Sequence, residues 1–262
     1  MTVQEALGGS GIEARDARLL LAAATGFSQS TVIAFPEQAL PDEARQRFSE
    51  FISRRKQGEP IAYIVGHKEF YGLELAVNPS VLIPRPETEL LVELALERKP
   101  RSVLDLGTGS GAIALAIKRH LPHARVVAVD SSAAALLIAR RNAVKHALEI
   151  DLRHGRWFGP VAGERFDLVV SNPPYVASGD ACLAELGFEP RGALAAGPAG
   201  LDALREIVTQ VGVFLEPGGW LLLEHGLGQD GAVRDLLVGA GLESAASWPD
   251  LAGIARVTGG KR

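Results

Sequence analysis

Cysteine and histidine are scarce in this chain. Its 262 residues contain one cysteine, Cys182, and six histidines that are scattered along the sequence. A single thiol excludes an intrachain disulfide, and one cysteine with dispersed histidines offers no spacing typical of a metal site. We therefore expect no bound metal, and a reducing compartment, the cytoplasm, as the place where the protein works.

Long apolar segments and an excess of basic residues are also missing. The leucine cluster at 19–21 follows several charged residues and is far shorter than the roughly 20 apolar residues that a membrane helix needs. Residues 1–100 carry 11 basic against 14 acidic side chains, and residues 101–262 carry 16 against 17. Neither half resembles a basic nucleic-acid-binding surface, so we expect neither a membrane nor a nucleic acid as a direct partner.

Hydrophobic residues are plentiful at 47%, and the length suits one α/β domain with a small appendage. Periodicity and capping signals predict helices at 13–25, 28–34 and 42–57, followed by a β-hairpin within 68–77. We expect a helical domain at 1–66 that recognises the substrate, a β-hairpin linker at 67–80, and a larger domain at 81–262.

The larger domain has the alternating pattern of a doubly wound sheet. A helix is predicted from Pro86, and apolar runs predict seven strands. These predicted strands lie near 102–106, 125–130, 149–153, 166–171, 219–224, 243–248 and 254–258.

The first of these strands runs into a glycine-rich turn, Gly107-Thr-Gly-Ser-Gly111, and then into a predicted helix. The three glycines permit a tight turn and close approach of a ligand, and the start of the helix presents free backbone N–H groups. Together with Ala112, the spacing also satisfies the dinucleotide pattern, so the turn alone does not distinguish NAD from another nucleoside-bearing cofactor.

Asp130 ends the second strand, 23 positions after Gly107. A carboxylate at this place can accept hydrogen bonds from both hydroxyls of a ribose. The alternative is that it caps the next helix, but Ser131 or Ser132 can do that, which favours the ribose role.

The segment Phe166–Tyr175 is the most informative one. A strand that must be buried delivers Asn172, Pro173, Pro174 and Tyr175 at its carboxyl end. The Asn172 side-chain oxygen and the Pro173 carbonyl are acceptors that can grip an NH2 group. Pro174 holds Pro173 in an extended conformation, and Tyr175 supplies a flat ring and a hydroxyl. A strand that simply ends in a proline turn is the plainer alternative.

Together these motifs resemble the class I S-adenosylmethionine-dependent methyltransferases that act on planar NH2 groups. Further segments are similar to the peptide chain release factor N5-glutamine methyltransferases, the HemK/PrmC family. The matching segments are Gly58–Gly66, Lys68–Gly72, Val81–Glu89, Phe188–Pro190 and Leu222–Gly226.

The resemblance implies an α/β fold with a doubly wound seven-stranded class I methyltransferase sheet, in which the last two strands are an antiparallel addition. It implies S-adenosylmethionine as cofactor, and the glutamine of the Gly-Gly-Gln loop of class 1 release factors as substrate. The implied residues are, for catalysis, Asn172, Pro173 and Tyr175; for substrate, these and Pro174; for cofactor, Gly107, Thr108, Gly109, Ser110, Gly111, Asp130, Trp157 and Asn172.

One position departs from the family pattern. Arg156 stands where the family usually has an aspartate that accepts from the adenine amino group. Trp157 can still stack on the adenine, although a buried core tryptophan is an equally good interpretation.

Other polar residues receive structural interpretations. Arg85, Glu87 and Glu89 resemble the family segment at the cofactor entrance, but they also suit the start of a helix with Pro86 in its first turn. Glu224 and His225 end a late strand and are interpreted as hydrogen-bonded structure.

Two rival functions remain open from sequence. An adenine-N6 or guanine-N2 methyltransferase would present the same planar NH2 group to Asn172, although the acidic balance counts against a nucleic-acid substrate. The second rival function is a noncatalytic module that binds the ribosome or the release factor. The intact glycine turn, Asp130 and Asn172 argue against this function. The sequence does not indicate an oligomeric state.

Overall fold

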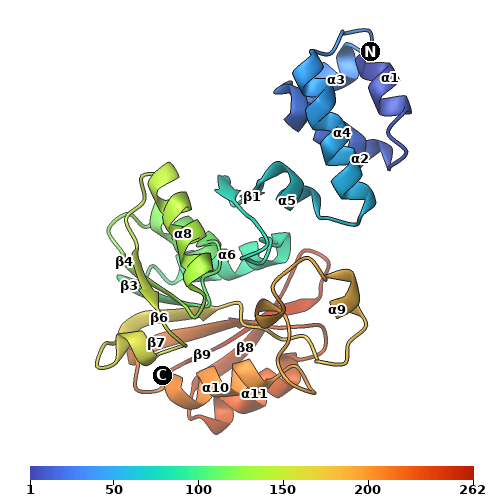
Figure 1. The fold of residues 1–262 in the computed structure, drawn as a ribbon. Helices are drawn as coiled ribbons and strands as arrows, with labels where there is room; N and C mark the ends of the chain where they lie inside the picture. Colours follow the sequence, from blue (N-terminus) through green and yellow to red (C-terminus); the bar gives the residue numbers. More distant parts are fainter. The chain divides into compact units, whose positions relative to one another are not determined.

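The computed structural model describes residues 1–262 and divides into two compact units, Met1–His67 and Lys68–Arg262 (Figure 1). None of the helices combines the length and apolarity needed to cross a membrane.

The first unit consists of helices around their own small core. Leu20, Leu21, Phe48 and Ile52 are among the buried residues of that core. The helices are α1 (Val3–Gly8), α2 (Ala14–Thr25), α3 (Gln29–Ala34), α4 (Asp42–Lys56) and α5 (Ile61–Val65).

Two of these helices, α1 and α5, were not predicted, because each is too short to show a hydrophobic period. A local signal for α1 does exist. The Thr2 hydroxyl accepts from the Glu5 backbone N–H, and the Glu5 carboxylate accepts from the Thr2 N–H, which is a capping box.

The hairpin of β1 (His67–Phe70) and β2 (Leu73–Ala76) stands at the start of the second unit, with only its first residue, His67, assigned to the first. Phe70, Leu73 and Leu75 are buried in the same cluster as helices α6 and α7. The hairpin is also tied to the unit by Asn142, whose side chain accepts from the Ala76 N–H at 2.7 Å and donates to the Ala76 carbonyl at 3.1 Å. The hairpin is therefore part of the core of the second unit.

A seven-stranded sheet forms the middle of this unit, in the order β5-β4-β3-β6-β7-β9-β8. The strands from β5 to β7 are parallel, and β9 is antiparallel to both of its neighbours. This confirms the doubly wound α/β fold. The strands are β3 (Ser102–Leu106), β4 (Arg125–Asp130), β5 (Asp151–His154), β6 (Phe166–Ser171), β7 (Leu215–Glu224), β8 (Glu243–Pro249) and β9 (Ala255–Lys261).

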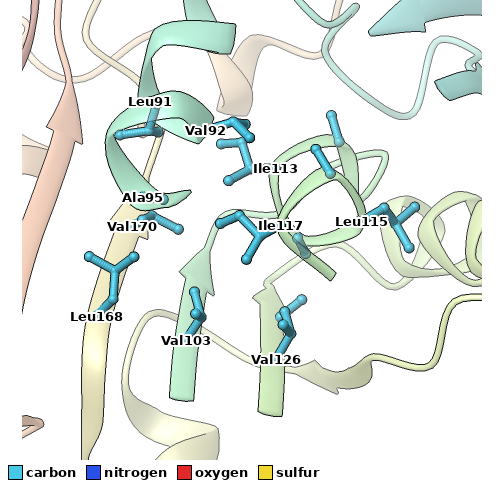
Figure 2. Close-up of a cluster of buried hydrophobic side chains, with 14 of the residues drawn as sticks. Leu91, Val92, Ala95, Val103, Ile113, Leu115, Ile117, Val126, Leu168 and Val170 are labelled. Atoms are coloured by element: carbon cyan, nitrogen blue, oxygen red, sulfur yellow. The ribbon is translucent and has the colours of Figure 1, made fainter. Parts of the chain in front are cut away.

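Helices cover both faces of the sheet, because successive side chains of a buried strand point to opposite faces. On one face, α6 and α7 pack on Val103, Val126 and Val170, as Figure 2 shows. On the other, α10 and α11 pack on alternate residues such as Leu104 and Val169. The helices of this unit are α6 (Glu89–Glu97), α7 (Ala112–His120), α8 (Ala133–Lys145), α9 (Cys182–Glu185), α10 (Asp202–Val211) and α11 (Asp230–Gly239), with 3-10 turns η1 (Pro86–Thr88), η2 (Gly159–Val161) and η3 (Arg191–Ala193).

The chain order reverses between β3 and β6, the two central strands. Leu106 and Ser171 are register partners at their carboxyl ends. Ligands bind at such a switch point in open α/β sheets, because the loops after the two strands turn away from each other and leave a crevice. The glycine turn follows β3 and Asn172 follows β6, so the fold brings both motifs to this crevice.

Candidate active site

The glycine turn between β3 and α7 depends on conformations that favour glycine. Gly107, Gly109 and Gly111 have φ of 74°, 56° and 84°. At Gly111, which caps α7, an added Cβ would lie 3.1 Å from Leu115 Cδ1 and 3.3 Å from Ala139 Cβ. At Gly109, it would meet no atom within 4 Å. The protein therefore fills the space beside Gly111 and leaves the space beside Gly109 empty. This arrangement suits a ligand that lies against the bare backbone of the turn.

Asp130 connects the second strand to this turn. Its carboxylate accepts the Gly109 N–H at 2.8 Å and the Ser132 N–H at 2.8 Å. Ser132, and not Asp130, provides the side-chain cap of α8, because its hydroxyl accepts from the Ala135 N–H. The carboxylate thus holds the turn in place. Asp130 also lines the cavity, and each of its oxygens can accept a further hydrogen bond.

Beneath the turn lies Asp105, which the sequence analysis did not single out. Its side chain is fully buried, and the Thr108 hydroxyl donates to Oδ2 at 2.6 Å while Oδ1 has no hydrogen-bond partner. Burial raises the pKa of Asp105 to about 7; the Thr108 hydroxyl opposes the increase and the Asp130 charge adds to it. A polar residue inside an apolar strand was the sequence signal for this group.

The buried Asp105 carboxyl should make stability depend on pH. Since its folded pKa lies above the unfolded value, its stabilising contribution is complete below about pH 4 and is lost as the pH rises through about 7. A difference of roughly 3 units corresponds to about 4 kcal/mol at most. Urea unfolding at pH 5 and pH 8 should therefore show Asp105→Asn gaining stability relative to wild type as the pH rises. The exposed Asp235→Asn is the control, and an identical pH dependence in wild type and Asp105→Asn would contradict the assignment.

Asn172 follows β6 and is half-buried at the cavity. Its Nδ2 donates to the Thr88 hydroxyl at 3.2 Å, which leaves Oδ1 as a free acceptor. Pro173 is buried, and no hydrogen bond within the protein uses its carbonyl oxygen. Two unused acceptors therefore occur in consecutive residues at the edge of the sheet.

Tyr175 takes a different place from its neighbours. Its hydroxyl donates to Glu224 Oε1 at 3.2 Å, and its ring packs against the core cluster on the α10 face. Gln229 fixes the segment by donating to the Tyr175 carbonyl at 3.1 Å and accepting the Gly226 N–H at 2.8 Å. Tyr175 does not line the cavity, so a stacking role for its ring stays a prediction.

A cavity of about 450 Å³ joins these parts, a volume within the range of small-molecule sites. Three of its walls are the glycine turn, the end of β4 and the loop after β6. The remaining walls come from segments 80–88, 155–157, 190–197 and 202–203.

Glu189 holds two of these walls together. Its side chain is almost completely buried, accepts the Ile83 N–H at 3.0 Å and forms an ion pair with Arg85. Glu189 thus connects the segments Val81–Glu89 and Phe188–Pro190, both of which resemble the family. Arg85 lines the cavity, and Pro86 begins a 3-10 turn, so the segment both starts a helix and forms a wall.

Trp157 and Arg156 form another wall. A Cβ at Gly107 would lie 3.7 Å from Trp157 Cζ3, so the indole lies against the glycine turn. The Arg156 guanidinium lies 5.5 Å from the indole centroid and pairs with Glu206 of α10, with Nε to Oε1 at 2.9 Å. The aspartate expected by resemblance is thus replaced by an arginine that is already paired with an acidic residue.

Most of the predicted site residues lie on this one cavity. It includes Gly107, Thr108, Gly109, Ser110, Asp130, Trp157, Asn172 and Pro174, whereas Gly111, Pro173 and Tyr175 do not line it.

The cavity fits a nucleoside-bearing cofactor. A turn without Cβ atoms leaves room for a close ligand, Asp130 offers carboxylate acceptors for hydroxyl groups, and Trp157 offers a flat ring. No group of three or more histidine, cysteine or acidic side chains could hold a metal ion.

The strand order and the position of the cavity define a class I S-adenosylmethionine-dependent methyltransferase. A methyltransferase from Pyrococcus furiosus has the same fold, with a TM-score of 0.58 and 19% identity over 81% of this chain and 98% of that one. A 16S rRNA N2 methyltransferase from T. thermophilus, solved with AdoMet and guanosine, has a TM-score of 0.57 and 25% identity over 75% of this chain and 49% of that one.

Sequence relatives narrow the class to one family. Residues 86–186 match the Methyltransferase small domain and residues 3–66 the PrmC N-terminal domain. The release factor glutamine methyltransferase of Burkholderia pseudomallei is 48% identical over 278 aligned positions, covering 99% of this chain and 96% of that protein. That of Xylella fastidiosa is 47% identical, covering 95% of this chain and 94% of that protein. The chain belongs to the release factor glutamine methyltransferases, and its cofactor is S-adenosylmethionine.

Proposed function

We propose that this protein methylates the side-chain amide nitrogen (N5) of the glutamine in the Gly-Gly-Gln loop of class 1 bacterial release factors. The observation that carries the proposal is the Asn172 carboxamide, which lines the same cavity as the glycine turn and has its oxygen free. The names of the full-length relatives support a release factor as the substrate.

A primary amide nitrogen is a weak nucleophile, because its lone pair is delocalised into the carbonyl. S-Adenosylmethionine, when bound, supplies a strongly electrophilic methyl group. The protein therefore has to hold the amide so that its nitrogen lone pair faces that group. Positioning reacting atoms at about 3 to 3.5 Å is worth roughly 7 to 11 kcal/mol.

Asn172 and Pro173 do this holding. The Asn172 Oδ1 accepts one N–H of the substrate amide and the Pro173 carbonyl accepts the other, which fixes the plane of the amide. Pro174 restricts Pro173 to extended geometry, so its carbonyl keeps one direction. Tyr175 is tied to Glu224 and holds the segment from behind. The methylated nitrogen sheds its proton to water after transfer, so no dedicated base is required.

The cofactor lies along the opposite wall. Gly107, Thr108, Gly109 and Ser110 offer the bare backbone of the turn, and Gly111 gives α7 its free N-terminal N–H groups. Asp130 accepts from the ribose hydroxyls, and Trp157 stacks on the adenine. Arg156 is engaged with Glu206, so adenine recognition here depends on stacking more than on a carboxylate from this position.

The helical unit, which matches the PrmC N-terminal domain, recognises the release factor, and the protein acts in the cytoplasm, where release factors work. The rival substrate, a nucleic-acid amino group, would suit the same Asn172. Against it stand a net charge of -4 and relatives that are named for a protein substrate.

The test is incubation with a purified release factor and isotopically labelled cofactor, followed by mass spectrometry of the peptides. We expect one methyl group on the glutamine of the Gly-Gly-Gln loop, and none when that glutamine is replaced by glutamate. Ribosomal RNA and DNA are offered in parallel. Label in a nucleic acid with none in the release factor would establish the rival function, and no label together with no cofactor binding by calorimetry would indicate a noncatalytic module.

A further inference from the structure

A group of hydrogen-bonding side chains, those of Thr88, Glu224 and Tyr175, lies next to Asn172. Asn172 Nδ2 donates to the Thr88 hydroxyl at 3.2 Å, and Thr88 itself is buried at the end of η1. Glu224, at the end of β7, accepts the Tyr175 hydroxyl through Oε1 and has no hydrogen-bond partner at Oε2. The four residues come from three segments, which are η1, the segment after β6 and the end of β7.

Glu224 is surrounded on all sides. It is 1% exposed, and the groups that act on it are the Thr88 and Tyr175 hydroxyls, the Glu87 carboxylate and the Arg256 guanidinium. Tyr175 alone meets hydrogen-bond geometry, while the Thr88 hydroxyl is close enough to favour the ionised carboxyl. A buried carboxylate with an unused oxygen next to a hydroxyl is expected to draw that hydroxyl's proton toward itself.

The direction of these hydrogen bonds decides which end of the Asn172 amide faces the cavity. A threonine hydroxyl has one proton to donate and lone pairs that accept. When its proton points to an ionised Glu224, its lone pair must accept from Asn172 Nδ2. Asn172 Oδ1 then faces the cavity as an acceptor.

We propose that Glu224, acting through Thr88, is a positioning residue that keeps the oxygen of the Asn172 carboxamide directed at the substrate amide. The inference rests on the proposed function, because it concerns how Asn172 binds an NH2 group. It assigns a role to Glu224, which does not line the cavity, and to the hydroxyl of Thr88, which does.

Protonation of Glu224 reverses the direction of the hydrogen bonds that run between Glu224, Thr88 and Asn172. Burial raises the pKa of Glu224 to about 7 against the opposing effect of the Thr88 and Tyr175 hydroxyls, with Glu87 adding to the increase and Arg256 opposing it. The Tyr175 hydroxyl donates to Oε1. Burial and Glu224 also raise the pKa of Tyr175, so the phenol keeps its proton and remains able to donate. A protonated Glu224 therefore donates from Oε2 to Thr88, Thr88 donates to Asn172 Oδ1, and the NH2 end of Asn172 turns to the substrate. Turnover should rise with pH through about 7 and then level off.

The test measures kcat at saturating cofactor and release factor from pH 5.5 to 8.5, a range of about 1.5 units on each side of the predicted midpoint. Wild type is expected to show the rise. In Glu224→Gln, the Tyr175 hydroxyl holds the amide oxygen, so the NH2 end faces Thr88 as in the protonated acid. We expect kcat to fall about tenfold above pH 7 and the rise to disappear, with the KM for release factor changed less.

Two Thr88 variants separate the hydroxyl from simple packing. Thr88→Val keeps the shape and removes the hydroxyl, and kcat should fall about tenfold. Thr88→Ser keeps the hydroxyl and should stay near wild type. Thr209→Val, on the exposed face of α10, is the control for a threonine-to-valine change outside the site. Calorimetry should give the wild-type cofactor Kd for Glu224→Gln and Thr209→Val. Because Thr88 lines the cavity, the cofactor Kd of Thr88→Val is measured as well, and we expect it to change less than kcat.

Several outcomes would overturn the proposal while the proposed function stands. These are an active wild type whose kcat does not change near pH 7, a Glu224→Gln variant that keeps the rise, or a Thr88→Val variant as active as Thr88→Ser. If Glu224→Gln and Thr88→Val fail to fold, the pH dependence of kcat in wild type and in Thr88→Ser still tests the proposal. A wild type that binds the cofactor but never methylates a release factor would instead contradict the proposed function.

Discussion

Replacing Asn172 by alanine should lower methyl transfer to the release factor by about 10²- to 10³-fold in kcat. The change removes one of the two acceptors that we propose to orient the amide, and loss of one such preorganised group costs roughly 3 to 4 kcal/mol of transition-state stabilisation. Steady-state kinetics with purified release factor give the ratio. Cofactor affinity should fall much less, because the glycine turn and Asp130 remain in place.

The chain offers a matched control in its other Asn-Pro pair. The Asn78 side chain accepts the Ser80 N–H at 2.9 Å in the turn after β2, and Asn78 does not line the cavity. Asn78→Ala should lose about 1 kcal/mol of stability from that hydrogen bond and keep most of its turnover. If Asn172→Ala turns over as fast as Asn78→Ala, the amide-holding role of Asn172 is refuted.

The second large effect concerns Asp130. Asp130→Asn should weaken cofactor binding by roughly 100-fold, measured as Kd by calorimetry. The carboxylate accepts two backbone N–H groups and lines the cavity, and a carboxamide in its place turns an NH2 toward one of those donors. The support of the glycine turn and the proposed contact with the ribose are lost together.

Asp167 is the control for this experiment. It also accepts two backbone N–H groups, those of Arg101 and Ser102 at 2.8 and 3.0 Å, but it does not line the cavity. Asp167→Asn should lower the melting temperature and leave the cofactor Kd unchanged. Equal losses of affinity in the two variants would show that Asp130 acts only through stability.

The centre of the fold could be predicted from sequence because its signals are local. The apolar runs of β3, β4 and β6 are buried on both faces, so each appears as a continuous hydrophobic segment between turn residues. The predicted bounds for these three strands agree with the structure. Two other strands agree less closely, since the edge strand β5 begins at Asp151 and β7 begins already at Leu215. Strand β5 has no buried residue and the residues just after Leu215 in β7 are exposed, and such stretches carry a weaker hydrophobic pattern.

The supporting contacts of the site could not be predicted, because they join residues far apart in the chain. Asn172 reaches Thr88 across 84 positions, and Glu189 reaches Arg85 across 104. No local periodicity encodes such pairs. Glu224 was interpreted as a structural residue at a strand end, and only its burial next to Tyr175 gives it a place behind Asn172.

The most direct measurement of the central claim is a crystal structure of the protein with S-adenosylhomocysteine and a release factor. We predict that the two amide N–H groups of the loop glutamine lie within hydrogen-bond distance, about 2.7 to 3.2 Å, of Asn172 Oδ1 and the Pro173 carbonyl. A glutamine bound with its amide oxygen toward Asn172, or held away from these two acceptors, would contradict the account.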